Sequence, residues 1–592
     1  MTYVAPVKDI AFIMRHVAGL AKGQADGLYA DLDDDTADAI LEEAAKFAEA
    51  RLVPLNWPGD RAGVRLENGK VITAPGWQEA YRDWTAAGWQ GLPAKEAFGG
   101  QGLPILLSSA CTEIWNAANM AFALNPLLTL GAIEALTVHG SQELQQRYLA
   151  DLVAGTCTGT MNLTEPQAGS DLAGLRSKAM PAGDGSYKIS GQKIFITYGD
   201  HDLTQNILHL VLARLPDAPA GTRGISLFLV PKILPDGSVN DVRCAGIEHK
   251  LGIHASPTCT MVFGDKDGAI GWLIGEANKG LACMFTMMNN ARLGVALQGV
   301  AIADRAYQQA LGFAKERRQG KAPGSTDAGM SLIIEHPDVK RMLLDMRTKT
   351  AAARAICYVT AAALDRYHRE TDPVQKKRAH EEASLLTPVA KAFSTDMGIE
   401  VASTGIQVHG GMGFVEETGA AQHYRDARIL AIYEGTNGIQ SIDLVTRKLP
   451  LANGETVKAA IARYRQAAEA VAQLNDPAFG KAGQRLREAV DSLERTTHWM
   501  LKMLDGAPEE AMAGATPYLR LFGLAAGGAF LAEAALAARA ALQAGETDPA
   551  HDQRIRDCRF FAENSAALAH GIENAVIDGA AAINGIFVAA AE

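Results

Sequence analysis

The chain has 592 residues, of which 48% are hydrophobic and 21% charged, and its formal net charge is -11 at pH 7. This length exceeds the size at which a single hydrophobic core keeps growing, so we expect several domains or one multi-layered subunit. The acidic balance gives no electrostatic reason to expect binding of nucleic acid or of an anionic membrane surface. Composition therefore favours a globular enzyme that acts on small molecules.

The seven cysteines are widely scattered and none forms a C-x-x-C pair, which argues against a disulfide framework and against a zinc site. The first 20 residues are interrupted by Lys8, Asp9 and Arg15, so they lack the apolar run of a secretory signal. The uncharged stretch 521–532 has only 12 residues, too few to cross a bilayer as a helix. We therefore expect a cytoplasmic protein with no transmembrane segment and no resident metal.

Helical patterns dominate the first part of the chain. Apolar residues recur at i, i+4 spacing from Leu41 to Leu52, after Thr36 as N-cap and before Pro54, where we expect this helix to end. We therefore predict an all-helical N-terminal domain over residues 1–157. Gly and Pro clusters separate its further helices, which are expected over 77–88, 106–123 and 126–149.

Short runs rich in β-branched residues begin at about residue 158 and indicate a middle β-domain over residues 158–279. Their length and the Gly and Pro residues between them are typical of a small antiparallel barrel or sandwich. Its strands are expected over 187–190, 193–197, 207–214, 225–230 and 260–263.

Helical periodicity returns beyond Gly280. A helical bundle is predicted over residues 280–450, followed by an Ala-rich helical extension over residues 451–592. The fold class is therefore mostly α with a central β-domain. The bundle helices are expected over 280–317, 337–368, 381–404 and 438–449.

Two common nucleotide-binding motifs are absent from the sequence. No G-x-G-x-x-G follows a predicted strand and opens a helix, and no G-x-x-x-x-G-K-[ST] occurs. These absences disfavour a Rossmann or P-loop enzyme, so a dinucleotide would have to be held in another way.

The segment 161–171, MNLTEPQAGSD, joins a short apolar strand to a turn rich in Gly, Ser and Asp. The amides and hydroxyls of such a turn can bind an anionic or heterocyclic ligand, although an ordinary strand-to-loop connection has the same composition. This segment resembles the LTEPxAGSD signature of acyl-CoA dehydrogenases. Three further segments resemble motifs of the same family in the same order, at 192–197, 250–258 and 407–414.

The resemblance covers about residues 80–448 and implies the family fold, in which a helical domain, a β-barrel and a four-helix bundle follow one another. It also implies FAD as the cofactor and an acyl-CoA thioester as the substrate. The segment 432–440, IYEGTNGIQ, contains the YEGT motif, whose carboxylate is the catalytic base of the family; here that residue is Glu434. Apolar flanks would raise the pKa of this carboxylate and make it a stronger base toward carbon acids.

The mechanism implied by the resemblance is α,β-dehydrogenation. Glu434 would remove the α-proton while the β-hydrogen leaves as hydride to flavin N5, which gives a trans-2-enoyl-CoA and reduced FAD. The thioester carbonyl would accept hydrogen bonds from the backbone N–H of Glu434 and from a ribityl hydroxyl of the flavin.

The resemblance also implies a set of binding residues. For FAD within the subunit these are Met161, Leu163, Thr164, Gly169, Ser170, Phe195, Ile196, Thr197, Thr436 and Gly438. For the FAD of a neighbouring subunit they are Arg317, Gln407, Gly410 and Gly411. Such contacts require at least a dimer, so a homodimer or homotetramer is expected. For the acyl-CoA they are Ser170, Asn289, Arg292 and Gly435.

The sequence departs from the family pattern in three places. Phe195 stands where several members have Trp, and the segment after Arg317 lacks the usual Phe. The C-terminal extension resembles a long subfamily typified by 3-methylmercaptopropionyl-CoA dehydrogenase. That resemblance allows a sulfur-containing substrate, but the same architecture also serves short or medium straight-chain acyl-CoAs.

Two other functions remain open at the level of sequence. An acyl-CoA oxidase shares the fold and the base but transfers electrons to oxygen, whereas a dehydrogenase is expected to use an electron-transferring flavoprotein. A scaffold protein of the same fold would have lost the chemistry, which the retention of Glu434 and of the flavin motifs disfavours.

Overall fold

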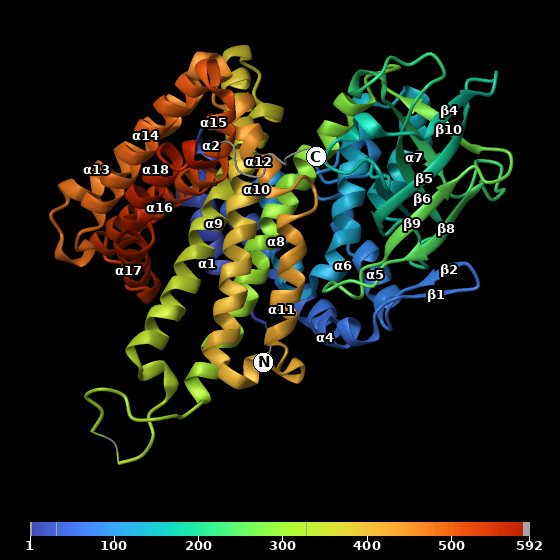
Figure 1. Cartoon of the computed structure of the whole chain (residues 1–592). Helices are drawn as coiled ribbons and strands as arrows, with labels where there is room; N and C mark the ends of the chain where they lie inside the picture. The colour runs from blue at the N-terminus through green and yellow to red at the C-terminus, as the bar shows by residue number, and fades with distance from the viewer. Residues whose placement is uncertain (1–2, 31, 327, 584–592) are drawn as a thin grey trace, which may run out of the picture.

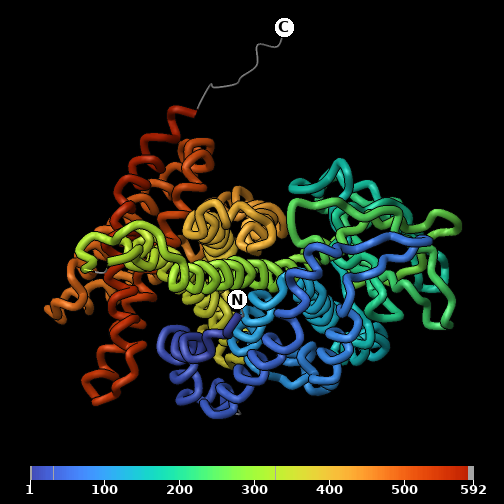
Figure 2. The backbone as a smooth tube through the Cα atoms, turned by 90° about the horizontal axis from the view of Figure 1, so that it is seen from below, coloured from blue at the N-terminus to red at the C-terminus, as the bar shows by residue number. Residues whose placement is uncertain are grey.

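The computed structural model describes residues 3–30, 32–326 and 328–583. Three parts lie side by side in Figure 1: a C-terminal helical extension, a central set of long helices, and a β-domain with the helices of residues 53–154 next to it. The first two helices of the chain lie instead by the central helices and the extension. Seen from below, the extension and the β-domain lie on opposite sides of the central helices (Figure 2). The prediction of a mostly helical chain with a β-domain and an added helical region is confirmed.

The N-terminal region contains seven α-helices among its described residues. Helix α3 is capped by Asp33, whose carboxylate accepts the N–H of Thr36 at 2.7 Å, so the N-cap predicted at Thr36 is three residues late. Pro54 does not end the helical run but occupies the first turn of α4, where its missing N–H is tolerated. The helices are α1 (Val7–His16), α2 (Leu20–Ala25), α3 (Asp34–Phe47), α4 (Val53–Ala62), α5 (Trp77–Ala86), α6 (Ile105–His139) and α7 (Gln142–Ala154).

The expectation of an all-helical N-terminal domain is wrong at one hairpin. Strands β1 (Arg65–Glu67) and β2 (Lys70–Ile72) pair antiparallel around Asn68 and Gly69, which both have positive φ. Asn-Gly favours this tight hairpin turn, and that local preference overrides the surrounding helical pattern. Helix α6 also differs from the prediction, because it continues through Pro126 with one non-helical residue at Asn119.

The β-domain is one eight-stranded sheet with the order β3-β6-β7-β10-β5-β9-β8, and β4 pairs with β5. The prediction of purely antiparallel pairing is wrong for β3 and β6, which are parallel with Met161 opposite Leu210. A parallel pair needs a long crossover, and the segment carrying β4 and β5 supplies it. The strands are β3 (Cys157–Asn162), β4 (Lys178–Pro181), β5 (Tyr187–Thr197), β6 (Asn206–Ala213), β7 (Ser226–Pro231), β8 (Val242–Ile247), β9 (Thr258–Phe263) and β10 (Ala269–Ile274).

Long helices form the centre of the molecule (Figure 1). Helices α8 and α10 approach closely where Gly299 faces Gly398, since a Cβ at Gly398 would lie 2.7 Å from the carbonyl oxygen of Gly299. The two helices therefore pack backbone against backbone at this point. The central helices are α8 (Gly280–Glu316), α9 (Pro337–Arg369), α10 (Pro373–His409), α11 (Ala420–Ala427) and α12 (Asn437–Asp443).

The extension packs on the central helices mainly through α16. Gly523 of α16 lies against the ring of Phe393 on α10, and Gly527 lies against Ala352 on α9. An ion pair between Arg520 and Glu400 also joins α16 to α10. The extension helices are α13 (Glu455–Gln473), α14 (Ala482–Gly506), α15 (Pro508–Ala513), α16 (Ala515–Gln543), α17 (Pro549–Asn564) and α18 (Ala569–Ile577); residues 584–592 of the predicted extension lie outside the described residues.

Two helices of the described chain, α6 and α16, are long and apolar enough to span a membrane by length and composition alone. In their most apolar windows, 78% and 83% of the residues are buried inside the protein. Both helices are therefore accounted for as core helices.

Substitution of Gly523 by Ala is expected to weaken the packing of the extension, because its Cβ would lie 2.1 Å from Cδ2 of Phe393. Such overpacking costs about 1–3 kcal/mol. Gly571→Ala is the control, since it adds the same methyl group in a helix where no atom lies within 4 Å. We expect a lower Tm for Gly523→Ala and an unchanged or higher Tm for Gly571→Ala. Equal Tm values would contradict this packing account.

Candidate functional site

The predicted base Glu434 lies in a tight turn between the short 3-10 helix η9 (Arg428–Ala431) and α12. Its φ is +56°, and that of Gly435 is +82°. A non-glycine residue with positive φ is uncommon and persists only where neighbouring groups hold it. The left-handed φ at position 435 favours glycine, and a Cβ there would also lie 2.7 Å from Nε2 of Gln440, whose side chain would have to move.

Buried side chains hold the turn in place. Nζ of Lys391, on α10, donates to the carbonyl oxygen of Gly435 at 2.9 Å and to Oδ1 of Asn437 at 2.8 Å. Nε2 of Gln440 donates to the carbonyl oxygen of Glu434 at 3.3 Å. Lys391 and Gln440 are both completely buried. The backbone that follows the Glu434 side chain is therefore fixed from the interior.

Two positive charges near Glu434 counteract the effect of burial on its pKa. Burial raises the pKa of Glu434 above that of an ordinary glutamate, while the positive charges of Arg292 and Lys391 oppose the rise. A carboxylate with a raised pKa is a stronger base, but it must be ionised before it can accept a proton. The two cations favour that ionised form.

The two predicted CoA contacts on α8 occupy different environments. Asn289 is exposed, whereas Arg292 is 5% exposed and its Nη2 would lie 3.8 Å from a Cβ at Gly435. Nη1 of Arg292 lies 3.7 Å from Oδ2 of Asp443, and its buried Nε has no hydrogen-bond partner among the described residues. Arg292 therefore faces the Glu434 turn, and Asn289 faces solvent.

The predicted flavin loop after β3 is anchored by a buried ion pair. Nζ of Lys193, on β5, lies 2.8 Å from Oε1 of Glu165 and donates to the carbonyl oxygen of Leu163 at 3.1 Å. Glu165 also accepts the N–H groups of Arg176 and Ser177. Burial opposes ionisation of Glu165, yet the charge of Lys193 and these hydrogen bonds hold its pKa at about 2. The loop is therefore tied to β5.

The predicted flavin-facing residues differ in exposure. Phe195 has a φ of +61° and is 58% exposed, at the point where the pairing of β5 with β9 shifts register. The side chains of Ile196 and Met161 are buried in hydrophobic clusters and are committed to the core. The remaining predicted contacts in this region are partly or fully exposed: Leu163, Thr164, Gly169, Ser170 and Thr197.

Thr436 and Gly438 lie at the start of α12, as predicted. Thr436 is the N-cap, and its Oγ1 accepts the N–H of Ile439 at 3.2 Å. Gly438 is exposed. The hydroxyl of Thr436 therefore stabilises the helix start that follows Glu434.

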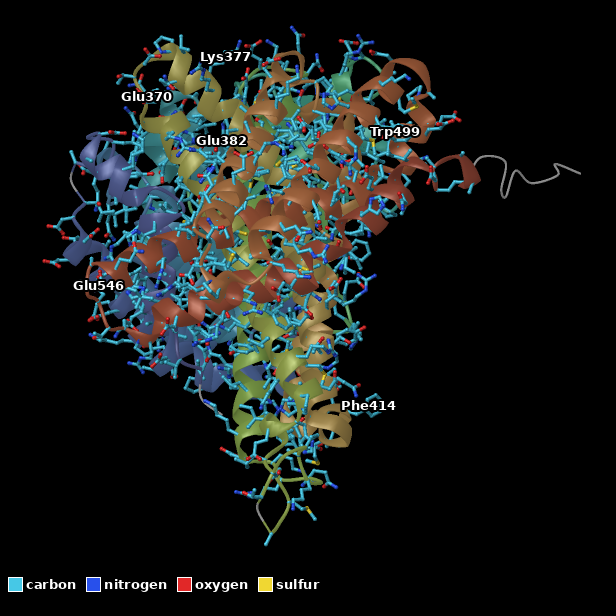
Figure 3. The ribbon with its side chains drawn as sticks, turned by 90° about the vertical axis from the view of Figure 1, so that its left-hand side faces the viewer. Glu370, Lys377, Glu382, Phe414, Trp499 and Glu546 are labelled. Carbon is cyan, nitrogen blue, oxygen red and sulfur yellow. The ribbon has the colours of Figure 1, made fainter. Side chains whose placement is uncertain are left out.

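The residues predicted to reach a neighbouring subunit lie at a different end of the helical bundle from the Glu434 turn. Arg317 caps α8 and Gly410 caps α10, and the two helix ends are adjacent because Phe313 stacks on His409 at 4.5 Å. At 1.5 Å per residue, about 28 Å of α10 separate Lys391 from Gly410. Gln407 and Gly411 are exposed at this end, where Phe414 projects with 87% of its surface accessible (Figure 3).

A cavity of about 510 Å³ lies elsewhere, at the seam between α10 and the extension. Glu382, labelled in Figure 3, lies on its α10 side, and Tyr464 and Phe530 lie on the extension side. None of the predicted site residues lines this cavity.

The sequence interpretation missed Lys391, Gln440 and the Glu165–Lys193 pair. Lys391 had a visible signal, because it is a single cation within the apolar run Val389–Ala390 and Ala392–Phe393 of a helix. Its contacts with residues 435 and 437 had no signal in the sequence, because they depend on how α10 packs against a turn that is distant along the chain.

Comparison with known proteins shows matches to family models along most of the chain. The matching descriptions are "Acyl-CoA dehydrogenase, N-terminal domain" over residues 34–156, "middle domain" over 160–266, "C-terminal domain" over 278–449, and "Acetyl-CoA dehydrogenase C-terminal like" over 455–586.

Individual relatives match over most of their length. The chain is 45% identical to 3-methylmercaptopropionyl-CoA dehydrogenase of Ruegeria pomeroyi, over 95% of this chain and 96% of that protein. It is 37% identical to a butyryl-CoA dehydrogenase of Syntrophomonas wolfei, over 81% and 80% of the two chains. An acyl-CoA dehydrogenase of Bacillus anthracis, solved with FAD, has the same fold, with a TM-score of 0.75, 20% identity and coverage of 93% and 89%.

Lys193→Met should leave the Glu165 carboxylate buried without its counter-charge. Removal of one partner of a buried ion pair costs about 3–5 kcal/mol, so urea unfolding should show a large loss of stability. The double variant Glu165→Gln, Lys193→Met removes both charges and should recover part of that loss. A double variant that is as unstable as the sum of the two single variants would contradict the pairing.

Proposed function

Because the chain belongs to the acyl-CoA dehydrogenase family, we propose that Glu434 is the base that removes the α-proton of an acyl-CoA thioester. The observation that carries this proposal is the left-handed turn at Glu434, held by Lys391 and Gln440 and flanked by two cations. A strained, partly buried carboxylate with a raised pKa is an arrangement expected of a catalytic base.

The residues present fit FAD as the cofactor. Phe195 is a large aromatic side chain with an exposed ring and a strained backbone, and a flat ligand would cover that ring. The adjacent loop, anchored by Glu165, presents exposed Gly169 and Ser170. When bound, FAD supplies the acceptor for the hydride that leaves the β-carbon.

In the proposed reaction the protein positions the substrate and moves one proton. The backbone N–H of Glu434 donates to the thioester carbonyl oxygen, which acidifies the α-carbon. The Glu434 carboxylate then accepts the α-proton, and the product is a trans-2-enoyl-CoA. Arg292 and Lys391 stabilise the ionised base before the transfer.

For the substrate we propose a short acyl-CoA, with 3-methylmercaptopropionyl-CoA first among the candidates. The support is the 45% identity over nearly the whole chain to an enzyme named for that substrate, together with the shared extension. The butyryl-CoA dehydrogenase relative makes a straight four-carbon chain the second candidate. An electron-transferring flavoprotein is the proposed electron acceptor.

We further propose a cytoplasmic homodimer or homotetramer. The support is the separation within one chain between Glu434 and the second set of predicted FAD contacts, Arg317, Gln407, Gly410 and Gly411. Because about 28 Å of helix lie between the two sets, a neighbouring subunit would bring the second set to the site.

Glu434→Gln should keep its FAD and its acyl-CoA binding but lose turnover by at least about 10²–10⁴-fold, since an amide cannot accept the α-proton. The measurement is anaerobic loss of flavin absorbance with 3-methylmercaptopropionyl-CoA, butyryl-CoA and longer acyl-CoAs. Glu417→Gln, an exposed carboxylate in the same domain, is the matched control and should react as wild type. Undiminished activity of Glu434→Gln would refute the assignment, and rapid peroxide formation by wild type would indicate an oxidase.

Phe195→Gly should release FAD more readily while leaving the apoprotein at least as stable. Glycine adopts a φ of +61° without strain, whereas loss of the ring removes a contact surface for the flavin. We expect the Kd for FAD to rise about tenfold, which corresponds to about 1.4 kcal/mol. The readouts are flavin fluorescence titration and the Tm of the apoprotein. Unchanged FAD affinity would show that this ring does not contact the cofactor.

A further inference from the structure

Lys391 is a buried lysine without a direct carboxylate partner. It is 0% exposed, and the hydrogen bonds of its Nζ go to the carbonyl oxygen of Gly435 and to Oδ1 of Asn437. Asp396, one turn further along α10, directs its carboxylate to Nδ2 of Asn437 at 2.7 Å. Among the described residues no ion pair within 4 Å is found for Lys391.

A lysine buried in this position destabilises the fold unless an opposite charge compensates its own. Burial of an ammonium carries a large desolvation penalty, and a neutral donor could satisfy the same two oxygens at lower cost. The charge therefore needs a compensating group, and Glu434 is attached to the residue whose carbonyl Lys391 contacts. Burial lowers the pKa of Lys391 to about 7, and Glu434 is the strongest influence that opposes this shift.

We propose that Lys391 is a positioning residue that fixes the left-handed turn and, in its protonated form, favours the ionised form of the Glu434 carboxylate. This inference rests on the proposed role of Glu434 as base. The other charged groups that face this region are Arg292 on α8, Asp396 on α10, Asp443 and Arg447 around α12, and Arg520 on α16. Arg292 is the larger cationic influence on Glu434, but the hydrogen bond to the carbonyl oxygen of Gly435 comes from Lys391. Asp396 is an anion that accepts a hydrogen bond from Asn437.

The direction of the pH effect follows from these charges. A cation beside Glu434 lowers the pKa of that carboxylate, so its removal raises the pKa. The rate depends on the ionised base and therefore rises with pH through the pKa of Glu434. Without Lys391, the acidic limb of the profile should move to higher pH.

The test uses the FAD-loaded holoenzyme and three variants. Lys391→Gln keeps a hydrogen-bond donor and removes the charge, whereas Lys391→Met removes both. Lys349→Met is the control, because Lys349 pairs with Asp345 and Glu400 and has no contact with the turn. The measurements are FAD content, Tm, and kcat/KM for a reactive acyl-CoA between pH 5 and 9.

We expect Lys391→Gln to retain FAD and to shift the acidic limb upward by about one pH unit, which makes it about tenfold slower than wild type below that limb. Lys349→Met should show no shift, and Lys391→Met should show the same shift with a lower Tm. An unshifted limb in Lys391→Gln would overturn the inference, even if Lys391→Met fails to fold. Glu434→Gln separates the two proposals, because full activity of that variant refutes the base itself.

Discussion

The proposed chemistry depends on a carboxylate that is buried enough to be basic and yet remains ionised. Glu434 meets this requirement through a turn of two consecutive left-handed residues, which fixes the backbone around the side chain. Hydrogen bonds from Lys391 and Gln440 hold that turn, and Arg292 and Lys391 oppose the effect of burial on the pKa of Glu434. Strain, burial and charge are therefore concentrated at one position, as is typical of catalytic sites.

The rest of the fold supports the Glu434 turn through helix α10. Its middle carries Lys391, which contacts the Glu434 turn, and its end carries the predicted contacts to a neighbouring subunit. Gly299 and Gly398 allow α8 and α10 to approach closely, and α16 of the extension packs on the far side of α10 at Phe393, two residues from Lys391. The extension therefore supports the helix that holds the turn, although it contributes no predicted site residue.

Much of this organisation was accessible from the sequence, because hydrophobic periodicity and ordered motifs predict helices, strands and the Glu434 segment. The errors came where local chemistry overrode periodicity: Asn68-Gly69 forms a hairpin, Asp33 caps α3, and Pro126 lies within α6. The parallel pairing of β3 with β6 depends on a crossover that short-range patterns do not specify. The role of Lys391 could not be predicted from short-range patterns either, because its hydrogen-bond partners lie more than 40 residues away in the sequence.

The central claim is tested most directly by the rate at which the anaerobic enzyme loses flavin absorbance with an acyl-CoA that carries deuterium at the α-carbon. If Glu434 removes this hydrogen as a proton, the deuterated substrate reacts several-fold more slowly than the ordinary one, and the rate rises with pH as Glu434 ionises. Equal rates for the two substrates, with no dependence on pH, would contradict the account.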